Sequence, residues 1–324
     1  MRASNTTASK RPVWMKKRIS WDARSGEVRS ILDDLELNSV CVSAACPNRP
    51  ECWKEKQVTF MILGENCTRS CKFCNVHKDP PEKVDILEPG RVAKAVKKLE
   101  IRYAVITSVT RDDLPDLGSD QFIRTVRSIK EKVPVVPVEL LIPDMGADER
   151  LLKEIAVSGA DVIGHNIETP RELFKTVRPG AGYGRSLKVL ETLRKYCATI
   201  PIKSSMIVGL GETKPGISST MKDLRNAGVD IIYLGQYLSP TREHWPVAKY
   251  YTPEEFQLLK DEAVKLGFSV VCSAPMVRSS YRAENAWRMT QNAERRKRIE
   301  ARGKHSAKRE KLYAGQAGQG SGGK

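Results

Sequence analysis

The chain of 324 residues contains no run of 18 apolar residues and only four histidines. The missing apolar run excludes a predicted transmembrane helix, and no apolar signal segment opens the chain. We therefore expect a cytoplasmic protein, a setting in which structural disulfides are rare. Only one C-x2-C pair occurs and no histidine pair lies near it, which disfavours a structural zinc site.

Cysteine is instead concentrated in one region: six of the eight cysteines fall within residues 41–74. They form two triplets, Cys41-x4-Cys46-x5-Cys52 and Cys67-x3-Cys71-x2-Cys74. Three thiolates in a short loop can hold three irons of a cubic [4Fe-4S] cluster and leave the fourth iron open. The second triplet resembles the signature of radical SAM enzymes, in which the open iron chelates S-adenosylmethionine (SAM). The first triplet has a different spacing, so a second cluster is the simplest interpretation.

Positive charge is in excess, with a formal net charge of +16. Half of it lies in residues 285–324, which contain eleven Lys and Arg against three Glu. This excess indicates an acidic or polyanionic partner. The last dozen residues have almost nothing to bury, so we predict a basic, Gly-rich, largely disordered tail over 285–324. Residues 1–10 are likewise predicted to be disordered. RNA binding by the tail is less favoured, because charge runs are more often solvated faces.

From residue 57 onward, short β-branched runs alternate with amphipathic stretches of helical period, which predicts βα units and a parallel sheet. The six predicted strands are Val58–Leu63, Tyr103–Val109, Val135–Leu141, Asp161–His165, Lys203–Val208 and Ile231–Gly235. Six such units predict an α/β fold, a partial (β/α)6 barrel over 57–284, with active residues on the loops at the carboxyl ends of the strands. Residues 11–56 are predicted to form an N-terminal cap that carries the first cysteine triplet, the ligands of the second, auxiliary cluster. The tail is predicted to be a C-terminal extension.

Longer motifs carry a resemblance to one family. The first triplet with its neighbours Pro47, Asn48, Glu51 and Trp53, the second triplet and the late Arg-Ser-Ser-Tyr-Arg of residues 278–282 together resemble lipoyl synthase. The resemblance covers about residues 11–284. It implies a radical SAM barrel and a sulfurtransferase that inserts two sulfur atoms, at C6 and C8, into an octanoyl chain amide-linked to a carrier lysine.

The resemblance also implies two [4Fe-4S] clusters and SAM as cofactors. The cluster on Cys67, Cys71 and Cys74 would cleave SAM to methionine and a 5′-deoxyadenosyl radical, which removes hydrogen from the octanoyl chain. The auxiliary cluster on the first triplet would be sacrificed as the sulfur donor. The family pattern points to Ser280 as its fourth ligand, with Ser279 as the alternative. An oxygen ligand is harder than thiolate and leaves the iron of such a cluster more readily.

Several loop residues are predicted to contact SAM, although each also has a purely structural interpretation. Thr107 and Ser108 are expected to bind its amino group. Asn166 and Glu168 are expected to reach its ribose or carboxylate, and Phe73 is expected to pack near the adenine. The two glycines expected to let the backbone approach the adenosine are Gly209 and Gly211.

The partners that follow from the resemblance are an octanoylated lipoyl carrier protein or domain, a reductant such as ferredoxin or flavodoxin, and an iron-sulfur cluster carrier. Neither a membrane nor a nucleic acid is expected as a partner. Two other interpretations stay open. One is another radical SAM sulfur-inserting enzyme, which would share the second triplet but not the ligand set with Ser280. The other is a non-catalytic iron-sulfur or zinc RNA-binding protein.

Overall fold

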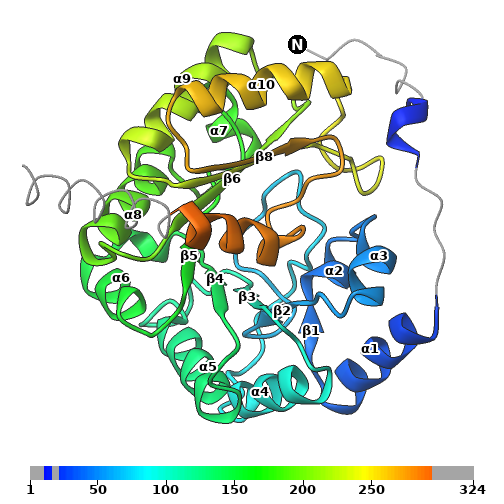
Figure 1. Cartoon of the computed structure of the whole chain (residues 1–324), viewed down its shortest axis with the longest axis vertical. Helices are drawn as coiled ribbons and strands as arrows, with labels where there is room; N and C mark the ends of the chain where they lie inside the picture. Colours follow the sequence, from blue (N-terminus) through cyan, green and yellow to red (C-terminus); the bar gives the residue numbers. More distant parts are fainter. Residues whose placement is uncertain (1–10, 17–21, 294–324) are drawn as a thin grey trace, which may run out of the picture.

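The computed structural model describes residues 11–16 and 22–293, which form one sheet surrounded by a ring of helices (Figure 1). Eight strands follow one another across the sheet in chain order. Strands β2 to β8 pair in parallel, and β1 pairs with β2 antiparallel. Their bounds are β1 Asn38–Ser39, β2 Thr59–Ile62, β3 Ala104–Ser108, β4 Val138–Leu141, β5 Val162–Gly164, β6 Ile202–Val208, β7 Ile231–Gln236 and β8 Val270–Ala274. Because β1 and β8 end this order, the described fold is an open, partial barrel.

All six predicted strands are present, as β2 to β7, and the barrel class is confirmed. The count of six is too low for the described residues, which add β1 and β8. Strand β8 begins inside the apolar run 268–272 and continues through the polar Ser273 to Ala274, and four of its five residues are only partly buried. Strand β1 has two residues, too few for an alternating pattern to appear.

Helices cover the outer face of the barrel, as Figure 1 shows for α4, α5, α6, α8, α9 and α10. The described helices of the N-terminal part are η1 Val13–Met15, α1 Ala23–Asp34, α2 Val40–Ser43 and α3 Arg49–Lys54. Those of the barrel are α4 Glu88–Lys98, α5 Ser119–Lys132, η2 Met145–Ala147, α6 Glu149–Ala156, α7 Arg171–Val177, α8 Tyr183–Tyr196, α9 Lys214–Asn226 and α10 Pro253–Lys265. In the described ranges, none of these helices has the length and apolar character needed to cross a membrane.

The helices form where periodic apolar residues coincide with terminal signals. In α5 the apolar side chains Phe122, Val126 and Ile129 are fully buried and lie on one face. Helix α10 begins with a capping box, in which Thr252 and Glu255 each bond the other's backbone N–H. Such local signals explain why the βα units can be predicted from the sequence.

The N-terminal segment packs on the barrel rather than standing apart from it. Val28 and Leu32 of α1 and Trp53 of α3 belong to the same buried cluster as the apolar residues of β2 and α4. Arg91 of α4 donates a 2.8 Å hydrogen bond to the carbonyl of Leu35. The segment that carries the first cysteine triplet is therefore fixed against the edge of the sheet.

The packed fold continues beyond the predicted start of the tail at residue 285. Residues 283–293 form a helix that crosses the middle of the ring in Figure 1 (orange). Ala286 is only 2% exposed, and the Trp287 ring lies 5.8 Å from that of Tyr103, just before β3. The tail from 294 onward and the predicted disordered residues 1–10 lie outside the described residues. The boundary was misplaced because a single tryptophan in a charged stretch gives no periodic signal.

Truncated chains distinguish the packed helix of residues 283–293 from the tail that begins at residue 294. We expect a chain ending at Ala293 to melt at the temperature of the full chain, whereas a chain ending at Asn285 loses the Trp287 contact. Burial of a large apolar side chain stabilises by about 2 kcal/mol, so the shorter chain should melt several degrees lower. Thermal unfolding under anaerobic conditions measures the difference. Equal melting of the two truncated chains would contradict the packing described for residues 286–293.

Candidate functional site

A cavity of about 660 Å³ opens at the carboxyl ends of the parallel strands. The cysteine loop after β2, the end of β3, the loop after β5, strand β6 and the end of β7 contribute to it, whereas the loop of residues 209–212 after β6 does not. Its lining includes Cys67, Cys71, Phe73, Cys74, Thr107, Ser108, Asn166 and Glu168, together with Cys41, Cys46, Ser279 and Ser280. This is the position at which barrel enzymes collect their active residues.

The second cysteine triplet sits in a loop whose backbone is held at both ends. The Cys67 N–H donates to the carbonyl of His77 at 2.8 Å, and the Cys67 Sγ accepts from the Thr110 N–H at 3.3 Å. Burial raises the pKa of the Cys71 thiol, and it raises that of Cys74 to about 12. The thiols are therefore protonated before iron binds, and cluster loading must release their protons.

An ion-pair clamp that the sequence did not reveal fixes this loop to the barrel. Arg69, between the first two cysteines, donates to Asp112 at 2.8 Å and to Asp144 at 2.6 Å. Burial works to raise the pKa of Asp144, but the hydrogen bonds and charge of Arg69 lower it to about 2. Two-point contacts from one guanidinium define the loop geometry more closely than a single bond would. The 75 residues between Arg69 and Asp144 hide this pair from any local pattern.

Two of the predicted SAM contacts have unused hydrogen-bonding capacity. Ser108 Oγ and Asn166 Oδ1 are buried, line the cavity and have no hydrogen-bond partner within the described ranges. Buried polar atoms are normally paired, so these atoms suit a ligand with amino and hydroxyl donors. SAM carries both groups. The hydroxyl of Thr107, in contrast, already donates to the carbonyl of Leu141 at 2.9 Å.

Glu168 is held in a conformation that few residues of its type adopt. Its φ is +65°, and its carboxylate accepts from the Asn166 side-chain amide at 3.0 Å. Burial raises its pKa, against the opposing charge of Arg178. A non-glycine residue in the left-handed region costs about 1 kcal/mol or more, and such strain clusters at functional sites.

The other predicted SAM contacts divide between the cavity and the fold. Phe73 lines the cavity, and it also packs against the cluster of Val177, Leu210 and Tyr237, so its contact with the adenine stays a prediction. Gly209 and Gly211 are not among the lining residues. At Gly209, φ is +104° and a Cβ would lie 2.6 Å from the carbonyl oxygen of Lys249, which explains glycine without a ligand.

His165 lies at the cavity wall, but both of its ring nitrogens have hydrogen-bond partners within the fold. Its Nδ1 is 3.0 Å from the carbonyl oxygen of Ile142, and its Nε2 is 3.0 Å from Ser186 Oγ. Burial lowers its pKa to about 4. The imidazole is therefore neutral and packed near pH 7.

This shift predicts a pH-dependent stability. Between the unfolded pKa of His165, near 6.5, and its folded pKa of about 4, the unfolded chain binds the proton and the folded one does not. The free energy of unfolding should therefore fall as pH falls through this window, by up to about 3 kcal/mol from this residue. Urea unfolding at several pH values should show a shallower fall for His165→Gln. His77→Gln, at an exposed position, is the control. Equal pH dependence of the two variants would contradict the assignment.

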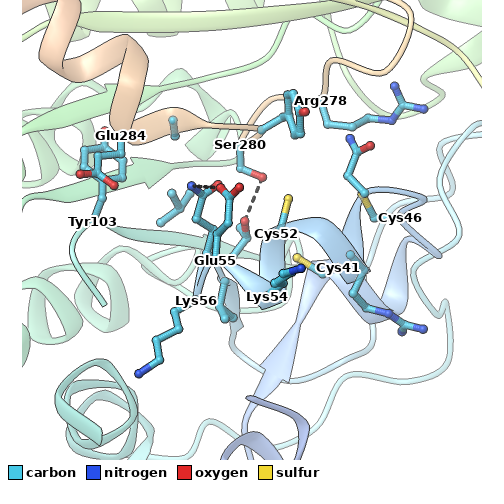
Figure 2. Close-up of a pocket in the computed structure, with 18 of the residues that line it drawn as sticks. Cys41, Cys46, Cys52, Lys54, Glu55, Lys56, Tyr103, Arg278, Ser280 and Glu284 are labelled. Atoms are coloured by element: carbon cyan, nitrogen blue, oxygen red, sulfur yellow. Dashed lines mark hydrogen bonds between the residues drawn. The ribbon is translucent and has the colours of Figure 1, made fainter. Parts of the chain in front are cut away.

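The first triplet surrounds a second cavity, of about 440 Å³. Cys41 lies in α2 and Cys52 in α3, with Cys46 between the two helices. Ser280 lines the same cavity, and Figure 2 shows Cys41, Cys52 and Ser280 directed toward one another. Burial raises the pKa of Cys46. Three thiols and one hydroxyl thus face a common space, a donor set that fits an iron-sulfur cluster with one oxygen ligand.

The two cavities adjoin through shared walls. Cys41, Cys46 and Ser280 line both of them, whereas Cys52 lines only the smaller cavity. Ser279 lines only the larger cavity, away from the first triplet's common space. Of the two candidate serines, Ser280 is therefore the one that lines a common cavity with all three cysteines.

Comparisons with known proteins identify the fold and the family. Residues 61–224 match the radical SAM superfamily. Among solved structures, methylornithine synthase aligns with a TM-score of 0.50 at 14% identity, over 80% of this chain and 85% of that one. Streptococcus suis SuiB bound to the precursor peptide SuiA aligns with a TM-score of 0.53 at 10% identity, over 77% of this chain and 52% of that one. These two likenesses concern the fold alone.

Closer relatives are found among curated sequences. The lipoyl synthase of Rubrobacter xylanophilus is 47% identical over 90% of this chain and 90% of its own length. That of Caldicellulosiruptor saccharolyticus is 46% identical over 85% of this chain and 97% of its own. That of Coxiella burnetii is 46% identical over 86% and 89%, respectively. With this identity over almost the whole length of each relative, the chain belongs to the lipoyl synthase family of the radical SAM superfamily.

Proposed function

We propose that the two cysteine triplets divide the reaction of this family between them. Cys67, Cys71 and Cys74 hold the [4Fe-4S] cluster that binds SAM. The auxiliary [4Fe-4S] cluster is held by Cys41, Cys46, Cys52 and Ser280. The observation that carries this assignment is the shared wall between the two cavities, because it brings the second ligand set beside the space where SAM and substrate meet.

When bound, SAM and the two clusters supply a 5′-deoxyadenosyl radical and sulfide, chemistry that no side chain can provide for an unactivated methylene group. The protein positions these groups. The Arg69 clamp to Asp112 and Asp144 holds the cysteine loop against the barrel. Ser108 and Asn166 receive the polar end of SAM, with Glu168 beside them.

The substrate is an octanoyl chain amide-linked to a lysine of a carrier protein or domain, and the product carries sulfur at C6 and C8. The larger cavity accepts the chain, because its wall combines apolar side chains such as Met61 and Ile207 with members of both ligand sets. Proximity matters here, since a carbon radical must meet sulfur before it reacts elsewhere. A reductant such as ferredoxin or flavodoxin, an iron-sulfur cluster carrier and a cytoplasmic location complete the proposal.

Mass spectrometry of a carrier peptide tests this function. The anaerobically reconstituted protein, with about eight irons per chain, is incubated with SAM, a reductant and an octanoylated lysine peptide. The account predicts 5′-deoxyadenosine and a peptide with two added sulfur atoms. SAM cleavage with no sulfur added would favour another radical SAM sulfur-inserting enzyme with a different substrate. Bound zinc without SAM cleavage would overturn the proposal.

A further inference from the structure

We propose that the Thr59 hydroxyl is a positioning group for the auxiliary cluster, because its hydrogen bond holds Ser280 Oγ in the ligand position. This inference rests on the proposed function, in which Ser280 is the non-cysteine ligand. Thr59 Oγ1 donates to Ser280 Oγ at 2.8 Å across a sequence separation of 221 residues. Both residues line the smaller cavity with all three cysteines, and a dashed line that ends on Ser280 marks the bond in Figure 2.

Packing alone does not explain a threonine at this position. Strand β2 is buried along its whole length, its other residues are Phe60, Met61 and Ile62, and Thr59 is 4% exposed. Valine would fill nearly the same space and suits a buried strand equally well. A buried hydroxyl needs a partner to offset its desolvation, and here the partner is the side chain of the proposed ligand.

The backbone of Thr59 is tied to the other side of the ligand set. Ser39 Oγ donates to the carbonyl oxygen of Thr59 at 2.9 Å. The same Ser39 Oγ accepts from the Cys41 N–H at 3.2 Å and so caps α2, the turn that presents Cys41. Thr59 thus stands between two proposed ligands, joined to Cys41 through Ser39 and to Ser280 directly.

Other contacts fix the main chain on either side of Ser280. Tyr281 Oη donates to Glu51 Oε1 at 2.7 Å, and the Asn48 side-chain amide donates to the carbonyl of Met276 at 2.7 Å. These bonds fasten the 276–281 segment to α3, which carries Cys52. They leave the side-chain direction of Ser280 to be set by Thr59.

The chemistry of an oxygen ligand gives this bond a purpose. Ser280 would hold an iron of the cluster through Oγ, so the ligand set is complete only when this oxygen faces the cavity that the three cysteines line. The hydrogen bond from Thr59 fixes the direction of Oγ. Groups that orient a metal ligand in this way typically change metal affinity by about 10–100-fold.

Iron release from the auxiliary site tests the inference. All variants are made in a full-length Cys67→Ala, Cys71→Ala, Cys74→Ala background, reconstituted anaerobically, and challenged with a ferrous chelator. Thr59→Val should release iron about 10-fold faster than the background protein. Thr59→Ser should release it at the background rate, because the hydroxyl is retained. Thr125→Val is the matched control, since it removes a buried threonine hydroxyl on α5 that donates to the local carbonyl of Gln121.

A double-mutant cycle separates a ligand effect from a general loss of packing. If Thr59 acts through Ser280, Thr59→Val should add nothing to the rate of Ser280→Ala, and Mössbauer spectra of Thr59→Val should lose the distinct oxygen-ligated iron. Thr59→Ala serves if the valine variant does not fold. Unchanged release in Thr59→Val, or the same acceleration with and without Ser280, would overturn the inference. Background protein that holds no cluster, or unchanged release in Ser280→Ala, would instead overturn the proposed ligand set itself.

Discussion

Cys71→Ala is expected to abolish SAM cleavage, whereas Cys46→Ala is expected to leave 5′-deoxyadenosine formation largely intact and to yield no sulfur-containing product. Cys71 lies in the loop after β2 at the strand ends, and Cys46 lies between α2 and α3 on the edge of the sheet. Both cysteines line the larger cavity with Ser108, Asn166 and Glu168, but Cys46 also lines the smaller cavity, which Cys71 does not. Loss of a direct iron ligand should reduce cleavage by at least about 100-fold, since changes one shell further out already cost 10–100-fold.

The control for both variants is Cys197→Ala. Cys197 is buried at the end of α8, with its Sγ 3.6 Å from the carbonyl oxygen of Ala156, and it lines neither cavity. It should retain SAM cleavage and product. Quantifying 5′-deoxyadenosine and thiolated peptide in one reaction gives both readouts. Equal loss of SAM cleavage in Cys46→Ala and Cys71→Ala would show that the triplets do not build separate clusters.

Ser280→Ala is expected to deplete the auxiliary cluster and to lose the sulfur-containing product, while Ser279→Ala is expected to be much milder. Ser280 shares the smaller cavity with Cys41, Cys46 and Cys52, and Ser279 does not line it. The alanine variant removes the oxygen donor and also leaves the Thr59 hydroxyl without its partner. Product yield should fall by about 100-fold or more.

Iron content and product yield, measured side by side, decide between the serines. In Ser280→Ala, iron should fall toward the four atoms of the SAM-binding cluster. In Ser279→Ala it should stay near the eight of the parent protein. Ser280→Cys provides a further comparison, because it restores a ligand with sulfur. A milder phenotype in Ser280→Ala than in Ser279→Ala would make Ser279 the ligand.

The sequence predicts the barrel well because its signals are local. β-branched runs such as Tyr103–Val109 and amphipathic stretches such as that of Phe122, Val126 and Ile129 declare their structure within a few residues. Strand β8 was missed because its apolar run is short and turns polar at Ser273. Trp287, alone among charged residues, likewise gave no sign that the helix of residues 283–293 packs on the barrel.

In the candidate site, too, local features could be predicted from the sequence and contacts between distant segments could not. The cysteine spacings are local, and they pointed to two clusters before any geometry was known. Interactions between distant segments could not be foreseen, namely the clamp from Arg69 to Asp144 and the hydrogen bond from Thr59 to Ser280. Gly209 is ambiguous for another reason: a positive φ and a close approach to a ligand both favour glycine, so its contact with the adenosine stays a prediction.

The central claim is that the cluster on Cys41, Cys46, Cys52 and Ser280 supplies the sulfur of the product. Heavy-isotope sulfide incorporated during reconstitution tests it most directly. Excess sulfide is removed, and the protein is allowed a single turnover with SAM, reductant and the octanoylated peptide. Mass spectrometry then gives the mass of the product peptide. The account predicts two heavy sulfur atoms per product from the parent protein and none from Cys46→Ala, which still cleaves SAM. Sulfur-containing product from Cys46→Ala, or product from the parent protein with sulfur of natural mass, would contradict it.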